Sequence, residues 1–116
     1  MLEALFGSKD KENTLQYILA RSQGYASEIA DFYGTKSSQI IKQLEALEIA
    51  GIFVSFQIGR ARVYKYNPRY YFLKELESLL LKARDTYKPE IIEHLTKAKV
   101  APRRKGKPAF ERKVAK

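Results

Sequence analysis

The chain of 116 residues contains no cysteine, and His94 is its only histidine. The first absence excludes disulfide bonds and thiolate metal sites. A lone histidine is most often structural or exposed, so we expect no metal site and no cofactor. His94 has no nucleophile or acid at motif spacing, and the sequence holds no glycine-rich phosphate loop. Enzymatic activity is therefore not expected.

Long apolar runs are missing as well. No stretch approaches the roughly 20 residues that are needed to span a bilayer. The N-terminal sequence MLEALFGSKDKENT has no basic region followed by a long apolar segment, so no secretory signal is predicted. The length is typical of one domain, and the cytoplasm is the expected location.

Acidic residues are scarce at one end of the chain. The sequence has 22 basic and 13 acidic residues, but residues 97–116 hold nine of the basic ones and only one acid, Glu111. Residues 1–96 are therefore almost neutral, whereas the tail is a polycation. The tail also contains prolines, a glycine and few apolar residues. We predict a folded domain at 1–96 and a tail at 97–116 that is disordered when alone.

The folded part combines helix-type spacing with one β-type stretch. The patterns predict, in order, a short amphipathic segment at Met1–Phe6, a helix within residues 14–24 that is capped by Gly24, a helix at Glu28–Tyr33 capped by Ser27, a helix at Thr35–Ala50, strands at Ile52–Gln57 and Arg62–Tyr66 around a turn at Gly59, a helix at Pro68–Thr86 and a short helix after Pro89.

The boundaries of the central helix follow from its sequence. Thr35 is the predicted N-cap, Gly51 ends the helix, and Ile40, Leu44 and Leu47 form its core stripe, with Ile41 beside it. Asn67 followed by Pro68 predicts the start of the next helix. The fold class predicted is mainly α with a small β-hairpin. The order helix, helix, glycine turn, helix, hairpin, helix is that of a winged helix-turn-helix domain.

Short or amide-tipped side chains occupy the outer face of the central helix: Thr35, Lys36, Ser38, Gln39, Lys42 and Gln43. In a helix-turn-helix domain this helix enters the major groove of double-stranded DNA. Gln39 and Gln43 could each bond an adenine edge in bidentate fashion, while Lys42 could reach guanine or phosphate. The alternative is an ordinary solvated face of an amphipathic helix.

The hairpin carries three further candidate DNA contacts, Arg60, Arg62 and Lys65. No acid lies between Ile58 and Tyr71. An arginine at a hairpin tip can enter a minor groove or pair with phosphate. A solvated turn would tolerate the same residues.

The segments GYASEIA, QLEALEIAGIF and GRARVYKYNPRYYFLKEL resemble the ArsR/MarR-like winged-helix transcriptional regulators of bacteria and archaea. The resemblance covers about Met1 to Ala83. It implies that helix Thr35–Ala50 recognises DNA, that the hairpin is the wing, and that helices Met1–Phe6 and Pro68–Thr86 form a dimer interface. Metal-sensing members use cysteine pairs or clusters of histidine and aspartate, so their inducer is not carried over to this chain.

The predicted helix after Asn67 carries more apolar residues than a small domain needs to cover. Since an exposed leucine stripe is a liability, we predict a homodimer through this helix and the N-terminal segment. Its interface residues would be Leu2, Leu5, Phe6, Phe72, Leu76, Leu79, Leu80 and Ala83.

The tail offers cations that could neutralise phosphates beside the bound site: Lys97, Lys99, Arg103, Arg104, Lys105 and Lys107. A solvated tail that aids solubility is the alternative. The sequence as a whole predicts a nucleoid-associated, sequence-specific regulator of transcription, with repression as the expected mode. Two other functions stay open, an architectural DNA-binding protein with little base preference and an antitoxin-like module that docks a partner protein.

Overall fold

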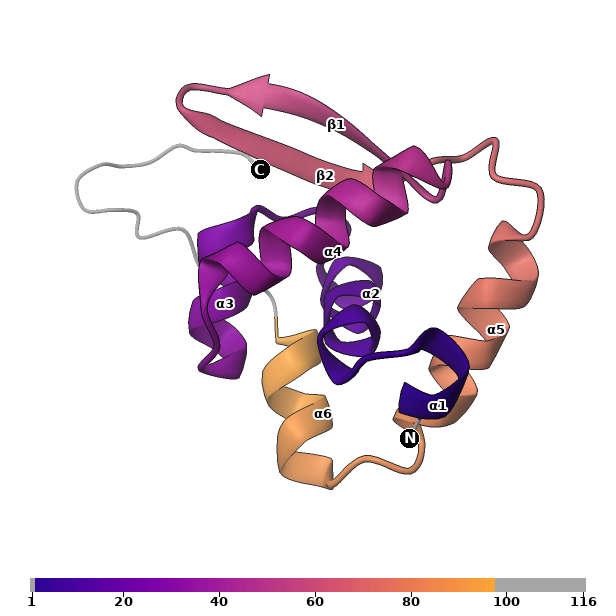
Figure 1. The fold of residues 1–116 in the computed structure, drawn as a ribbon. Helices are drawn as coiled ribbons and strands as arrows, with labels where there is room; N and C mark the ends of the chain where they lie inside the picture. Colours follow the sequence, from indigo (N-terminus) through magenta and orange to yellow (C-terminus); the bar gives the residue numbers. More distant parts are fainter. Residues whose placement is uncertain (1, 98–116) are drawn as a thin grey trace.

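The computed structural model describes residues 2–97, which form six helices and one antiparallel hairpin (Figure 1). The elements are α1 (Glu3–Phe6), α2 (Lys9–Arg21), α3 (Ala26–Tyr33), α4 (Ser37–Ile49), β1 (Phe53–Ile58), β2 (Ala61–Tyr66), α5 (Leu73–Arg84) and α6 (Pro89–Thr96). The prediction of a mainly helical chain with a small hairpin is confirmed, and the arrangement is compatible with a winged helix. Within the described range no helix is long and apolar enough to cross a membrane.

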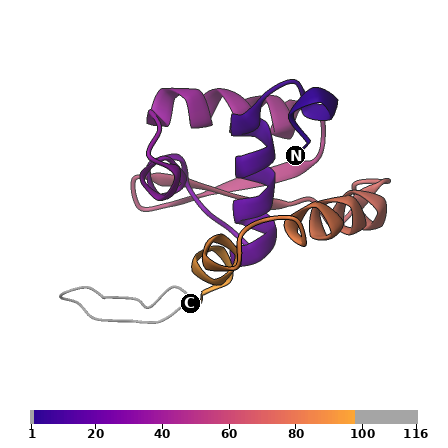
Figure 2. The ribbon, with the colours of Figure 1, turned by 90° about the horizontal axis from the view of Figure 1, so that it is seen from below.

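Helix α2 is the centre of the fold and contacts α1, α3, α4, β2, α5 and α6. Figure 2 shows α4 on one side of α2 and both α5 and α6 on the other. Leu15, Tyr17 and Ile18 of α2 are buried against apolar residues from the surrounding elements. Because α2 is covered on several sides, few of its residues are exposed, and its buried residues include the polar Glu12, Thr14 and Gln16.

The helix pair α3 and α4 is joined by a tight turn at Gly34, whose φ of 68° is left-handed. The predicted core stripe of α4 is confirmed, since Ile40, Leu44 and Leu47 are all buried. Ile41 is partly exposed. The end of α4 is also as predicted, because the NH of Gly51 bonds to the Glu48 carbonyl and that of Ile52 to the Leu47 carbonyl, the pattern of a Schellman cap.

The two strands pair from Phe53 with Tyr66 to Ile58 with Ala61, around the turn at Gly59. Gly24 forms an isolated bridge with Tyr64 through two backbone hydrogen bonds of 2.8 and 3.0 Å. The prediction that Gly24 caps a helix is therefore wrong, and Ser22 takes the left-handed position at the end of α2. A Cβ at Gly24 would lie 3.0 Å from the Tyr17 ring, so a side chain there would require the ring to shift slightly.

Several predicted helix starts also differ from the structure. Helix α2 begins at Lys9, before the predicted segment at 14–24, with the Ser8 side chain as its N-cap. Helix α3 begins at Ala26, with Tyr25 rather than Ser27 at the N-cap position. Pro68 does not open a helix, although the Asn67 side chain accepts a hydrogen bond from the Arg69 NH at 3.0 Å, as a helix cap would. The same side chain also donates to the Gly51 carbonyl at 2.9 Å. Turns occupy 68–72, and α5 begins only at Leu73.

Hydrogen bonds between distant residues hold α5 and α6 on α2. The buried Gln16 amide donates to the Leu80 carbonyl at 2.7 Å. The Arg21 guanidinium donates to the carbonyls of His94 and Leu95 at the end of α6, and it lies 5.0 Å from the centre of the Tyr17 ring. These contacts fix both C-terminal helices to the central helix.

Candidate nucleic-acid interface

The outer face of α4 presents its polar side chains as the sequence predicted. Ser38, Gln39 and Lys42 are exposed and Gln43 is half-buried, while Ile40 and Leu44 face the core. The acidic residues of α4, Glu45 and Glu48, are both in the C-terminal half of the helix. The N-terminal half of α4, which follows the turn at Gly34, therefore carries cationic and amide side chains and no acidic one.

The start of α4 differs from the prediction. Lys36, not Thr35, is the N-cap residue, and no side chain caps the helix. The Thr35 hydroxyl instead donates a 3.0 Å hydrogen bond to Oε1 of Gln39, and the Thr35 NH bonds to the Ala30 carbonyl. Thr35 therefore orients a candidate reading side chain, and the first NH groups of α4 have no side-chain acceptor. Its first turn also contains no acid, so nothing there repels a phosphate.

The hairpin lies alongside α4 (Figure 1) and is bonded to it. Ser55 of β1 donates to Oε2 of Glu48 at 2.6 Å, and Arg62 of β2 donates to the Ser55 hydroxyl at 2.8 Å. Burial together with the nearby charges of Glu48 and Glu45 raises the pKa of Tyr64 on the same strand. Arg62 therefore lies on the face of the hairpin that carries the link to α4.

Ser55 and Glu48 were not among the predicted site residues. Alternation along the strand places Ser55 on the same face as Phe53, and this pattern could have identified it as facing the protein. Its partner on α4 could not be identified, because the contact depends on the angle at which the hairpin leaves the helix.

The structure does not bring all the predicted wing residues together. Arg60 is exposed beside Gly59 at the hairpin tip. Lys65 is three positions from Arg62, so alternation places it on the opposite face, where its ammonium lies 5.7 Å from the centre of the Phe56 ring. Arg60 and Arg62 thus belong to the candidate interface with α4, whereas Lys65 belongs to the other face.

Positive charge within the described residues is concentrated in the segment that holds α4 and the hairpin. Residues 34–69, which hold the turn, α4 and the hairpin, contain six basic and two acidic residues. Residues 1–33 contain three basic and five acidic residues. The basic excess of the folded part therefore falls in the segment that holds the candidate interface, although Lys65 lies on the other face of the hairpin.

The residues predicted for a dimer interface fall into two groups. Leu80 and Ala83 are buried within the chain itself, so both are removed from any surface between two copies. Leu5 and Phe72 are exposed, at 64% and 54%. The remaining members are half-buried: Leu2, Phe6, Leu76 and Leu79. The prediction placed Leu80 in the dimer interface, but Leu80 belongs to the part of the apolar stripe of α5 that packs on α2.

The predicted tail begins at Lys97, which is exposed directly after α6. The other predicted phosphate contacts lie outside the described residues: Lys99, Arg103, Arg104, Lys105 and Lys107. Within residues 2–97 no group of three or more histidine, aspartate or glutamate side chains is placed to hold a metal ion.

Comparisons of the chain with protein-family models, with curated proteins and with solved structures found no match.

Proposed function

We propose that this chain is a sequence-specific regulator of transcription that binds double-stranded DNA as a homodimer, acting as a repressor at its operator in the cytoplasm. The observation that carries the proposal is the acid-free, polar N-terminal half of α4, which is exposed and lies next to a basic hairpin. A helix with its side chains is about 10–12 Å wide, which fits the major groove of about 12 Å.

In this proposal Gln39 and Gln43 read base edges while Lys36, Ser38 and Lys42 contact bases or phosphates near the start of α4. Arg60 at the hairpin tip reaches the flanking backbone or minor groove. The uncapped NH groups at the start of α4 offer a further phosphate contact. The resemblance to ArsR/MarR-like regulators assigns the same two elements to DNA.

The dimer is the second part of the proposal. Leu5 and Phe72 expose large apolar surfaces, and half-buried Leu76 and Leu79 lie on the same helix as the buried Leu80. A two-fold dimer through α1 and α5 would cover these side chains and present two copies of α4. The operator would then be an inverted repeat.

The deciding experiment is selection of bound sequences from a random pool of duplexes, followed by affinity measurements on the selected site and on random DNA. A specific regulator should bind its site at least roughly 10³-fold more tightly than random DNA. Equal affinities would favour the architectural function. An antitoxin-like function would be favoured if a chain that ends at Lys97 loses DNA binding altogether.

The same shortened chain tests the tail. Each phosphate that the tail neutralises should contribute about 0.9 to the slope of log affinity against log salt concentration. The shortened chain should therefore bind more weakly and with a smaller slope, but with unchanged preference for the selected site, because phosphate contacts carry no base information. An unchanged slope on long duplexes would show that the tail does not lie on DNA.

A further inference from the structure

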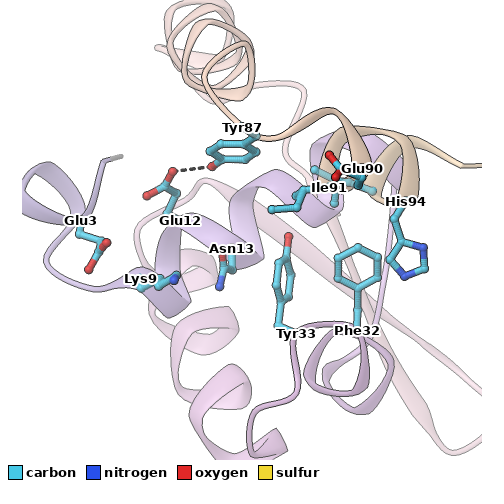
Figure 3. Close-up of a pocket in the computed structure, with 11 residues that line it drawn as sticks. Glu3, Lys9, Glu12, Asn13, Phe32, Tyr33, Tyr87, Glu90, Ile91 and His94 are labelled. Atoms are coloured by element: carbon cyan, nitrogen blue, oxygen red, sulfur yellow. Dashed lines mark hydrogen bonds between the residues drawn. The ribbon is translucent and has the colours of Figure 1, made fainter.

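A cavity of about 650 Å³ lies between α1, α2, α3 and α6 (Figure 3). Its size falls within the range of about 300–1,000 Å³ that is typical of small-molecule sites. No residue of α4 or of the hairpin is among its described lining residues. The lining comes from four elements, the neighbouring α1 and α2 together with α3 and the distant α6. Glu3, Glu12, Tyr33 and Glu90 are among the contributors. The cavity therefore exists only in the folded chain.

One wall of the cavity is aromatic and apolar. Phe32 packs edge-on against Tyr33 at 4.7 Å between ring centres, and on its other side it stacks on His94 at 4.7 Å. Figure 3 shows the Tyr33 ring rising from α3 toward Ile91 of α6, with the hydroxyl at its leading end. These contacts fix the rings, so the wall is preformed.

The Tyr33 hydroxyl is a polar group available to a ligand. Burial is the main cause that raises the pKa of Tyr33, so the hydroxyl remains protonated and neutral in ordinary buffers. Within residues 2–97 it forms no hydrogen bond with another group, although Tyr17, Tyr66 and Tyr87 all have one. A neutral phenol can accept a hydrogen bond from a ligand and can also donate one.

Among the described residues that line the cavity, negative charges outnumber positive ones. Three carboxylates, Glu3, Glu12 and Glu90, contribute to the lining, against one ammonium, Lys9. The Arg21 guanidinium also lies beside the aromatic wall, 5.4 Å from the centre of the Phe32 ring, where it is held by the carbonyls of His94 and Leu95. Burial acts to raise the pKa of Glu12, but hydrogen bonds from the Tyr87 hydroxyl and the Leu2 NH outweigh it and lower the pKa, so Glu12 is ionised. Because Glu12 accepts hydrogen bonds from these partners, it would attract a cation through its charge rather than by direct contact. Glu3 and Glu90 are exposed.

We propose that this cavity binds a small organic cation that carries a flat ring, of the arylalkylamine class. The ring would lie against Tyr33 and Ile91, and the ammonium group would point toward Glu90 and the Tyr33 hydroxyl. The field of three carboxylates disfavours an anion of the same shape, and the aromatic wall favours a ring over a simple alkylamine. This binding does not depend on the proposed DNA-binding function.

Three probes of the same shape but different charge test the proposal on the full chain by isothermal titration calorimetry: tryptamine, its neutral alcohol tryptophol and the anion indole-3-acetate. Tryptamine should bind at least about tenfold more tightly than tryptophol, and indole-3-acetate should bind most weakly. Equal binding of all three, tightest binding of the anion, or no binding of tryptamine at millimolar concentration would overturn the proposal.

Two variants locate the site. Glu90→Gln should weaken tryptamine about two- to fivefold, the range expected of a partly exposed ion pair, and should leave tryptophol unchanged. Tyr33→Phe keeps the ring and removes the hydroxyl, and should weaken tryptamine about three- to tenfold. Glu93→Gln is the matched control, because Glu93 is an exposed carboxylate of α6 that does not line the cavity. Equal losses for Glu90→Gln and Glu93→Gln would show only general attraction between charges, and would refute the site.

Discussion

The Ser55 hydroxyl donates a hydrogen bond of 2.6 Å to the Glu48 carboxylate and so ties strand β1 to the last turn of α4. Arg62 donates to the same hydroxyl at 2.8 Å from the neighbouring strand. A single serine therefore connects the proposed reading helix with both strands of the wing. If DNA is bound as proposed, the angle between these two elements is set before binding, which lowers the entropy that binding must overcome.

Replacing Ser55 tests this link. Ser55→Ala should lower the free energy of unfolding by about 1.5–3 kcal/mol, since a hydrogen bond to a charged group is lost. It should also weaken DNA binding by the chain that remains folded, because the angle between α4 and the hairpin is no longer fixed. Urea denaturation and fluorescence anisotropy with labelled duplex measure the two effects. Gln57→Ala, on the same strand face near the tip, is the control. A loss of stability with unchanged DNA affinity would show that the link has no part in binding.

Substitutions can distinguish Gln39 and Gln43, which are proposed to contact base edges, from Thr35, which orients Gln39. Gln39→Ala and Gln43→Ala should each reduce the preference for the selected site over random DNA by about 1–3 kcal/mol. Thr35→Val removes the hydroxyl that donates to Gln39 and should reduce the preference by less than Gln39→Ala does. Competition binding with random duplex gives these numbers. If Thr35→Val acts as strongly in the Gln39→Ala background as alone, Thr35 does not work through Gln39.

Two apolar residues of the α5 region, Phe72 and Leu80, should behave differently when they are replaced. Phe72 is 54% exposed, so Phe72→Glu should dissociate the dimer without unfolding the chain. Leu80 is fully buried, so Leu80→Ala should cost about 2–5 kcal/mol of stability. Analytical ultracentrifugation and urea denaturation distinguish these outcomes. A monomeric mass for the unmodified protein at micromolar concentration would refute the proposed dimer.

Glu12 makes the stability depend on pH in a defined direction. Its pKa in the folded chain is lowered from 4.5, so its contribution is present above about pH 4.5 and is lost as the pH falls through the lower folded value. Glu12→Gln should therefore be less stable than the unmodified chain at pH 6, and this difference should shrink on acidification. Urea denaturation at several pH values measures it, with Glu93→Gln as the exposed control. A difference that grows toward acid pH would contradict the assignment.

The elements set by local patterns could be predicted from the sequence. The stripe of Ile40, Leu44 and Leu47 and the Schellman cap at Gly51 depend on spacing within one helix and on one glycine. The hairpin was placed within a residue or so at each end for the same reason, because β-type residues flank a turn at Gly59. Here the local preference and the final fold agree.

The features that could not be predicted depend on contacts across the chain. Asn67 and Pro68 have the pattern of a helix start, but Asn67 closes a turn with Arg69 and is also bonded to the Gly51 carbonyl, 16 residues away. Leu80 could not be assigned to the core or to a surface from periodicity, because a stripe has the same spacing in both cases. The cavity was missed entirely, since its lining combines residues from four separate elements.

The bridge between Gly24 and Tyr64 joins residues that are 40 positions apart, whereas the two strands of the hairpin pair across a turn of two residues. The hairpin can therefore close on the microsecond scale from local contacts alone, but it is anchored to the body only after a long loop has closed. The amide hydrogen of Tyr64 bonds to Gly24 rather than to its own hairpin partner. The hydrogen-exchange rate of the Tyr64 amide should therefore report whether the wing is docked on the body. The exchange rate of the Val63 amide should report whether the hairpin itself is formed. Comparing the two rates would show whether the wing can detach as an intact unit while α2, α3 and α4 stay folded.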